Sequence, residues 1–308
     1  HHARVSALVD DAMPLVLAAA ARERESYVRY LESVGFRAES GEAVVDIGYS
    51  GSMQLALDRL LGSKRALDGL YLITIRGASA ALLARGLSGA GYLGESVDRL
   101  SREHAFFRHV ALYETLFSND ATSLVRMTSH DGRFVPELQR RVPGETRRID
   151  VVRAVHRGAL RFVDAAAREL GPEARGMSVP PSLATREANA FFDAPHARDA
   201  RIFAGVPFEN AFGSAMTVPL VPDDGAPMES AVMWEAGRRA IVLDAQRRDP
   251  SLRASALERV VHSAIDAVLP RLLAPNKAAK LRHEPSLFFA DSRSRSLRAI
   301  GRRYLRVV

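Results

Sequence analysis

A short run of chemistry-bearing residues lies at positions 46–54 of this 308-residue chain, between an apolar stretch and a helical pattern. It reads Asp-Ile-Gly-Tyr-Ser-Gly-Ser-Met-Gln. Glycine lets a backbone come close to a ligand, serine hydroxyl groups donate hydrogen bonds, and the start of a helix favours an anion. We therefore expect either a loop that binds a phosphate or a sugar, or a tight turn in which a serine caps the helix.

The ligand-binding hypothesis gives each residue of this stretch a role. Asp46 is the predicted catalytic residue, because a carboxylate at a strand end can orient a sugar hydroxyl group, hold a metal ion or act as a base. An arginine that precedes the strand would clamp a phosphate, unless it belongs to a solvated helix face. The predicted ligand-binding residues are Gly48, Tyr49, Ser50, Gly51, Ser52, Gln54 and Arg24.

The elements around this stretch predict an α/β fold. Residues 43–47 and 70–75 are apolar runs without alternation, which is typical of strands buried on both faces of a sheet. Residues 53–61 between them have helical periodicity. A strand, a helix and a strand within about 30 residues form a βαβ unit. We therefore expect a Rossmann-like parallel sheet that binds its ligand at the carboxyl ends of the strands.

The remaining patterns predict a more helical C-terminal half. Residues 5–36, 103–117, 146–170 and 252–273 read as helices, residues 123–138 as a hairpin, and the glycine-rich residues 86–96 as a loop that could cover the site. We expect three parts: a Rossmann-like domain over residues 1–145, a mostly helical part over 146–275 and a basic tail over 276–308.

Composition excludes several kinds of site. The chain has no cysteine, so it has no disulfide bond, thiolate nucleophile or cysteine-ligated zinc. None of its nine histidines lies in a His-x-x-x-His pattern, so no metal site is predicted, although Mg²⁺ could accompany a phosphate ligand. No apolar run approaches the ~18 residues of a membrane span, and no signal peptide is visible. The two leading histidines resemble the remnant of a tag, so we expect a fragment of a longer, cytoplasmic protein.

The net charge of the chain is concentrated at its end. Residues 276–308 contain nine lysines and arginines against two acids, which accounts for the whole net charge of +7. Such a tail could contact an anionic glycan or the inner membrane surface, or simply be solvated. No interleaved aromatic stripe accompanies the basic residues, so no nucleic-acid partner is expected.

Two resemblances bear on the ligand. The stretch VVDIGYSGSMQLAL is similar to the phosphoribosyltransferase loop, in which an apolar strand leads to acids and a Thr-Gly-Gly-Thr type turn that holds a 5-phosphate. That resemblance implies phosphoribosyl pyrophosphate as the substrate and Mg²⁺ as the cofactor. The chain departs from the pattern, because it has one acid where that family usually has two and places Met53 in the turn.

The second resemblance spans roughly residues 27–240 and rests on the ordered segments YVRYLESVGF, VVDIGYSGSMQLAL, LDGLYLITI, YETLFSNDATSLVRMTSHDGRFVPEL and MWEAGRRA. This series looks like the region downstream of the phosphatase core in large bacterial haloacid-dehalogenase-superfamily-like proteins. Those proteins are often associated or fused with glycosyltransferases in surface-polysaccharide gene clusters. Their loop typically has an aromatic residue where Tyr49 stands, and the matching residues here are Asp46, Gly48, Gly51, Met53 and Gln54.

This second resemblance implies a module of bacterial surface-polysaccharide synthesis that binds a nucleotide sugar or a sugar phosphate and transfers the glycosyl group. No Asp-x-Asp motif follows a first strand, so the phosphatase chemistry of that superfamily is not expected here. The alternatives are a phosphoribosyltransferase-like enzyme and a non-catalytic scaffold that docks a partner through the aromatic residues 106–117.

Overall fold

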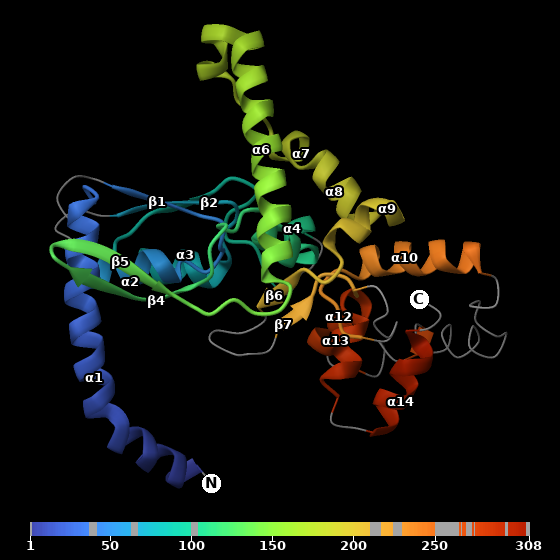
Figure 1. The fold of residues 1–308 in the computed structure, drawn as a ribbon, viewed down its shortest axis with the longest axis horizontal. Coiled ribbons are helices and arrows are strands. Elements are labelled where there is room, and N and C mark those ends of the chain that lie inside the picture. Colours follow the sequence, from blue (N-terminus) through green and yellow to red (C-terminus); the bar gives the residue numbers. More distant parts are fainter. Residues whose placement is uncertain are drawn as a thin grey trace. The chain divides into compact units, whose positions relative to one another are not determined.

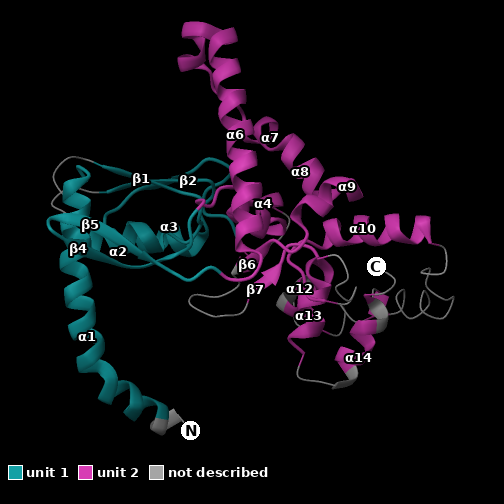
Figure 2. Ribbon diagram, in the orientation of Figure 1, with its two compact units in different colours: residues 1–98, 121–141 teal, residues 99–120, 142–308 magenta. Residues whose placement is uncertain are grey.

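The computed structural model describes residues 2–36, 42–62, 67–99, 104–209, 217–223, 230–249, 265, 267–268, 273, 275–292 and 295–305. The chain forms two compact units (Figure 2). Unit 1 contains His1–Asp98 and Ala121–Arg141, and unit 2 contains Arg99–Asp120 and Val142–Val308. Helices make up 59% of the structure and a small parallel sheet accompanies them, so the predicted α/β class is confirmed. None of the described helices combines the length and the apolar character that a membrane span requires.

A three-stranded parallel sheet forms the centre of unit 1. Its strands are β1 (Ala43–Asp46), β2 (Asp68–Tyr71) and β3 (Gly89–Gly91), in that spatial order. Helix α2 (Ser52–Leu61) connects β1 to β2, and helix α3 (Arg76–Leu83) connects β2 to β3. The predicted βαβ unit is confirmed, because β1 and β2 pair in parallel with Val44 opposite Gly69.

The sheet is covered on one face, which corrects the expectation that its strands are buried on both. Val44 and Tyr71 are buried, whereas Val45 is 81% exposed and Leu70 is 49% exposed. The two helices lie on the same side of the sheet (Figure 1). Side chains alternate between the faces of a strand, so only every second residue packs against α2 and α3. The apolar run is therefore half-buried.

The glycine-rich residues 86–96 do not form a lid. They contain β3, which pairs with β2 and completes the sheet. Glycine suits this strand because the helices press closely on it: a Cβ atom on Gly89 would lie 2.8 Å from Cδ1 of Leu82. The glycines, which in the sequence indicated a loop, are instead explained by the close packing of this strand against α3.

A buried glutamine fastens α2 to the sheet. Gln54 is fully buried, and its Nε2 donates to the carbonyl oxygens of Leu67 at 2.5 Å and Ser88 at 2.8 Å. Its Oε1 accepts a hydrogen bond of 2.6 Å from the hydroxyl group of Tyr71. Buried polar groups are stable only when they are paired, so this network fixes the helix over β2 and β3, through the residues that precede both strands and through the last residue of β2.

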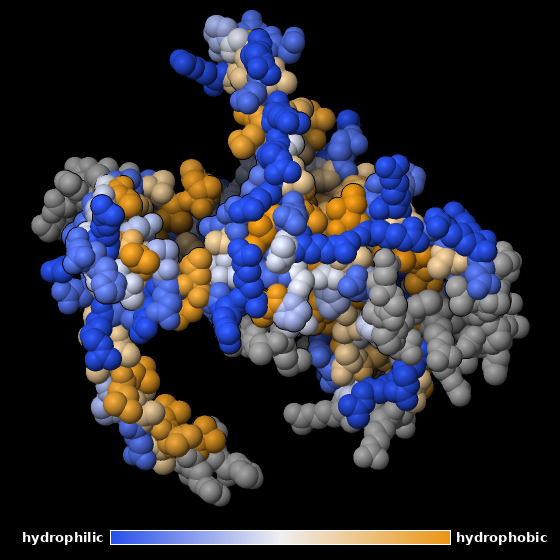
Figure 3. Space-filling model, viewed as in Figure 1, coloured by the Kyte–Doolittle hydropathy of each residue, from blue (hydrophilic) through white to orange (hydrophobic). Residues whose placement is uncertain are grey.

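Helix α1 (His2–Ser33) and the hairpin of β4 (Leu124–His130) and β5 (Arg133–Leu138) complete unit 1. The hairpin is confirmed, with Asp131 and Gly132 both at positive φ, as a tight turn between antiparallel strands requires. Tyr30 of α1 packs edge-on against Phe134 with ring centroids 6.1 Å apart. The N-terminal half of α1 exposes apolar side chains, among them Leu8 and Leu15 (Figure 3).

Unit 2 is mostly helical. The predicted helix over 146–170 is confirmed as α6, and the predicted helix over 252–273 falls almost wholly outside the described residues. The elements before the C-terminal segment are α4 (Ala105–Arg108), α5 (Val110–Leu116), α6 (Glu145–Leu170), η1 (Gly171–Gly176), α7 (Pro181–Ala184), α8 (Arg186–Asp193), α9 (Ala197–Ala200), η2 (Arg201–Phe203), β6 (Pro207–Glu209), β7 (Thr217–Pro219) and α10 (Glu235–Arg248).

Aromatic side chains form part of the core of unit 2. Trp234 is buried, its ring lies 5.6 Å from that of Phe203, and its Nε1 donates to the carbonyl oxygen of Phe192. Phe106 is 1% exposed and stacks on Tyr113, with ring centroids 5.1 Å apart. The aromatic segment over 106–117, which we expected as one helix, is broken at His109 into α4 and α5. Its buried rings are not available for docking a partner.

The C-terminal residues are integrated into unit 2, which corrects their interpretation as a tail. They form α12 (Pro275–His283), α13 (Pro285–Ala290) and α14 (Arg295–Tyr304). Arg238 is 1% exposed and donates from Nη1 to the carbonyl oxygen of Leu305, while Nε donates to Glu235. The other oxygen of Glu235 accepts from the backbone of Ser286. Apolar residues of this segment, including Leu281 and Phe289, share one core cluster.

We predict that Tyr71→Phe lowers the free energy of unfolding by about 1–3 kcal/mol, because it leaves the buried Oε1 of Gln54 without a donor. Urea unfolding measures this change. Tyr27→Phe is the matched control, since that hydroxyl group has no hydrogen bond among the described residues. Equal stabilities for the Tyr71→Phe variant and the wild-type chain would contradict the structural role of the network.

We also predict a histidine-dependent loss of stability in mild acid. Burial lowers the pKa of His109 below its ordinary value of 6.5, although the hydrogen bond of 2.7 Å to Asp193 opposes this effect. The unfolded chain therefore binds the proton more readily, so stability is complete above that ordinary value and falls below it.

Urea unfolding at about pH 7.5 and about pH 5.5 measures this dependence. His109→Gln should reduce the difference between the two conditions, whereas His196→Gln, at an exposed position, should leave it unchanged. An unaltered difference in the His109→Gln variant contradicts the assignment.

Candidate functional site

The loops that follow the three strands are joined by backbone hydrogen bonds at the carboxyl edge of the sheet. The backbone N–H of Leu72 donates to the carbonyl oxygen of Asp46 at 3.3 Å. The N–H of Ile75 donates to Tyr49 at 3.1 Å, and that of Thr74 donates to Gly94 at 3.0 Å. These bonds bring the predicted loop over residues 46–52 next to the start of α3. The edge is thus built from segments that lie far apart in the sequence.

Asp46 lies at the end of β1, where the βαβ pattern predicts it. It is half-buried, and its Oδ1 accepts a hydrogen bond of 2.7 Å from the backbone N–H of Gly48. Burial and, secondly, the negative charge of Asp46 raise the pKa of Tyr71 to about 12. One carboxylate oxygen thus stabilises the turn, and no hydrogen bond engages Oδ2 among the described residues. Asp46 can therefore shape the loop and still accept a proton or a hydroxyl group.

The start of α2 has no side-chain cap. Its N-cap residue is Gly51, at a φ of +68°, and the first helical hydrogen bond runs from Leu55 N to the carbonyl oxygen of Gly51. The hydroxyl groups of Ser50 and Ser52 lie 3.0 Å apart and hydrogen bond to each other. The expected turn with a serine cap is therefore wrong. The N–H groups of the first helical turn remain donors for a ligand or for water.

Gly51 has a structural reason to be glycine as well. A φ of +68° is unfavourable for residues with a Cβ atom. A Cβ atom there would also lie 3.2 Å from Cδ1 of Leu82 on α3, which is closer than ordinary packing. The residue is thus required by the backbone and by the contact between α2 and α3, whether or not a ligand approaches.

Arg76 is a residue that the sequence analysis did not select. It is the first residue of α3, is exposed, and has no ion-pair partner among the described residues. The hydrogen bond between Ile75 and Tyr49 places its backbone beside the loop of Asp46. The signal that identifies it is its position directly after the second predicted strand, since the carboxyl ends of parallel strands meet at one edge.

The structure takes two predicted ligand-binding residues away from this edge. Gln54 uses both its amide nitrogen and its amide oxygen within the core, so no group is left for a ligand. Arg24 donates from Nη2 to the carbonyl oxygen of Leu60, at the opposite end of α2. With a rise of 1.5 Å per residue, that end lies about 12 Å from Ser52 along the helix axis. Arg24 therefore caps the C-terminus of α2.

Asp46 is the carboxylate of the predicted loop at the carboxyl edge, and the loop that follows β3 contains Glu95 and Asp98. Among the described residues, no cluster of three or more histidine, aspartate and glutamate side chains is suited to a metal ion. Mg²⁺ usually takes one or two carboxylates together with phosphate oxygens of the substrate. The described residues thus provide no cluster of ligands for Mg²⁺ alone, and a magnesium ion at this edge would depend on phosphate oxygens of the substrate.

No protein-family model, curated protein or solved structure matches this chain. The resemblances to the dehalogenase-like and phosphoribosyltransferase families therefore stay hypotheses. The function has to be inferred from the carboxyl edge of the sheet: one half-buried acid, two serine hydroxyl groups, an uncapped helix start and an exposed arginine.

We predict that Gly51→Ala destabilises the chain more than Gly62→Ala does. Both glycines flank α2 with positive φ, at +68° and +59°, so each substitution strains the backbone. Only Gly51 adds a close contact, because nothing lies within 4 Å of a Cβ atom at Gly62. Melting temperatures of the two variants measure the difference, and equal losses would show that the contact with Leu82 carries no energy.

Proposed function

We propose that unit 1 binds the phosphate group of a nucleotide sugar or sugar phosphate at the carboxyl edge of its sheet. In this proposal the chain serves bacterial surface-polysaccharide synthesis and transfers the glycosyl group, and its sheet is the core of a Rossmann-like domain. The observation that carries the proposal is electrostatic. Both α2 and α3 begin beside this edge with neither an acidic residue in the first turn nor a side-chain cap.

An unbalanced positive potential at this edge favours an anion. The start of a helix carries a partial positive charge, so a cation there is unfavourable by about 0.3–1 kcal/mol. Arg76 nevertheless occupies the first position of α3. A bound phosphate would reverse the sign of this interaction, because it accepts hydrogen bonds from the N–H groups of α2 and pairs with the guanidinium group. A residue that is locally unfavourable, such as a cation at the start of a helix, is expected at a functional site.

The reaction assigns distinct tasks to the two charged groups. An oxygen of the acceptor hydroxyl group attacks the anomeric carbon, and the bond from that carbon to the phosphate oxygen breaks. Asp46 takes the proton of the attacking hydroxyl group on Oδ2. The departing phosphate keeps the electron pair, and Arg76 with the first-turn N–H groups of α2 stabilises the charge that develops.

The alternatives have less support from the described residues. A phosphoribosyltransferase-like enzyme needs Mg²⁺ on its diphosphate, and the described residues hold no cluster of three or more acidic or histidine side chains suited to a metal ion. A scaffold that docks through residues 106–117 would need several exposed rings, whereas Phe106, Phe107 and Tyr113 are buried and only Phe117 of this segment is exposed. The contact of residues 276–308 with a membrane or an anionic glycan, and the cytoplasmic location, stay predictions.

Isothermal titration with UDP-glucose and glucose 1-phosphate tests the proposal. We predict that Arg76→Gln weakens binding by tenfold or more, which is about 1.4 kcal/mol. Arg59→Gln is the matched control, because Arg59 is an exposed arginine in the last turn of α2 and should leave affinity unchanged. Asp46→Asn should reduce glycosyl transfer more than it reduces binding, since it retains the shape of the turn but not the base.

Other results would overturn this assignment. Absence of binding by both sugar compounds, or equal losses in the Arg76→Gln and Arg59→Gln variants, contradicts a phosphate site at this edge. Binding of phosphoribosyl pyrophosphate alone, and only with Mg²⁺, would favour the phosphoribosyltransferase-like alternative.

A further inference from the structure

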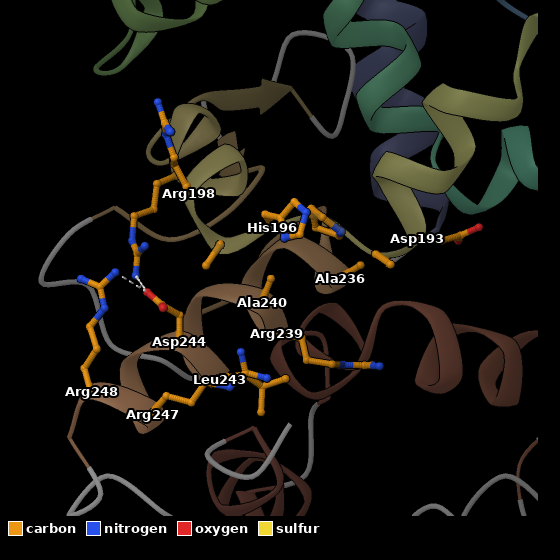
Figure 4. Close-up of a pocket in the computed structure, with 14 residues that line it drawn as sticks. Asp193, His196, Arg198, Ala236, Arg239, Ala240, Leu243, Asp244, Arg247 and Arg248 are labelled. Atoms are coloured by element: carbon orange, nitrogen blue, oxygen red, sulfur yellow. Dashed lines mark hydrogen bonds and ion pairs between the residues drawn. The ribbon is translucent and has the colours of Figure 1, made fainter.

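A hollow of about 550 Å³ lies in unit 2, between α10 and the segment that contains α9 and η2 (Figure 4). Its size falls within the range of about 300–1,000 Å³ that is usual for small-molecule sites. The described residues that line it lie within 193–201 and 236–248, which belong to a single unit. It is separate from the sheet edge of unit 1, and nothing in the proposed function uses it.

Arginines outnumber acids in the lining of this hollow. Five arginines are present, at positions 198, 201, 239, 247 and 248, against two aspartates. Both aspartates are already paired. Asp193 binds Arg108 and His109, and Asp244 lies 2.6 Å from Arg201 and 3.0 Å from Arg248. The hollow therefore keeps an excess of positive charge.

Three of the arginines have no partner among the described residues: Arg198, Arg239 and Arg247. The helix dipole accounts for Arg247, because cations are favourable in the last turn of a helix such as α10. It does not account for Arg198 or Arg239, which lie near the start of α9 and in the first half of α10. Unpaired arginines on two facing elements make this concavity attractive to an anion.

The arrangement of these side chains indicates the shape of the anion. Figure 4 shows the side chains of Arg198 and Arg239 directed away from each other, and Arg248 directed toward Asp244. A single phosphate could not contact Arg198 and Arg239 together, so a ligand that engages more than one of these arginines needs several linked phosphates.

The other lining residues indicate its chemistry. The remaining side chains are small or apolar, such as Ala236, Ala240 and Leu243, apart from His196. The described lining residues include no asparagine, glutamine, serine or threonine. It is therefore suited to recognising charge rather than a pattern of sugar hydroxyl groups, and guanidinium groups bind phosphate oxygens in bidentate fashion.

We propose that this hollow is a binding site for a molecule that carries two or more linked phosphates, either a nucleoside diphosphate or a free polyphosphate. Arg198, Arg239 and Arg247 hold the phosphates. Arg201 and Arg248 are restrained by Asp244, whose pKa the hydrogen bond from Arg201 holds below its usual range. Asp244 thus stays charged and keeps these two arginines in place at neutral pH.

Isothermal titration of the full chain with inorganic tripolyphosphate, ADP and orthophosphate at physiological ionic strength tests the proposal. The double variant Arg198→Gln, Arg247→Gln should weaken tripolyphosphate or ADP binding by tenfold or more, and orthophosphate should bind far more weakly than either. The variant breaks no ion pair in the part of the chain that the structure describes, so its melting temperature should match that of the wild-type chain. Tighter binding of ADP than of tripolyphosphate would identify a nucleotide, and the reverse a free polyphosphate.

A control of equal charge separates a built site from general attraction. Arg168→Gln, Arg175→Gln removes two exposed arginines of the same unit, at the end of α6 and in η1, and should leave the affinity within twofold. Equal weakening by both double variants, or no tripolyphosphate and ADP binding by the wild-type chain, overturns the proposal. Glucose 1-phosphate carries one phosphate and therefore reports on the sheet edge, whereas tripolyphosphate reports on the hollow. Arg76→Gln should weaken only the binding of glucose 1-phosphate, and the Arg198→Gln, Arg247→Gln variant only that of tripolyphosphate, so failure of the sheet-edge site and failure of this hollow are distinguishable.

Discussion

Both units depend on one constraint, that a polar group removed from water must find a partner. In unit 1 the buried amide of Gln54 meets this constraint with two backbone carbonyl groups and the hydroxyl group of Tyr71. In unit 2 the buried pair of Glu235 and Arg238 meets it through Ser286 and the carbonyl oxygen of Leu305. Removing one member of either set leaves at least one buried group unpaired, so these groups specify one arrangement of the elements around them.

The candidate site in unit 1 follows from this arrangement. Gln54 fixes α2 against β2 and β3, and the backbone hydrogen bonds from Leu72 to Asp46 and from Ile75 to Tyr49 hold the loop before the helix beside the start of α3. Gly51 lets α2 and α3 approach each other there, since its position faces Leu82. The same residues therefore build the core and aim the uncapped N–H groups outward. Gln54 and Gly51, which the sequence predicts as ligand-binding residues, therefore act by positioning α2.

Charge is distributed differently from what the sequence indicates. The basic residues of 276–308 account for the net charge, yet that segment is packed into unit 2 through α13 and the contacts of Arg238. The unpaired arginines that line a concavity lie on α9 and α10 instead. Arg239, Leu243 and Arg247 follow a spacing of four residues, which is the signal that places them on one helix face. Because that part of the chain showed no clear element in the sequence, this face was not recognised.

The sequence by itself determined the local elements and their order. The periodicity of residues 53–61 and 146–170, the Asp131-Gly132 turn and the position of Asp46 at a strand end are all local properties, and the structure confirms them. Tertiary structure alone decided how these elements are covered and what their polar groups contact. The exposure of Val45, the strand within the glycine-rich segment, the capping role of Arg24 and the place of Arg76 depend on partners distant in the chain. Hydrophobic periodicity indicates which residues share one face of a helix or strand, but not which other element packs against that face. These contacts could therefore not be predicted from residue spacing.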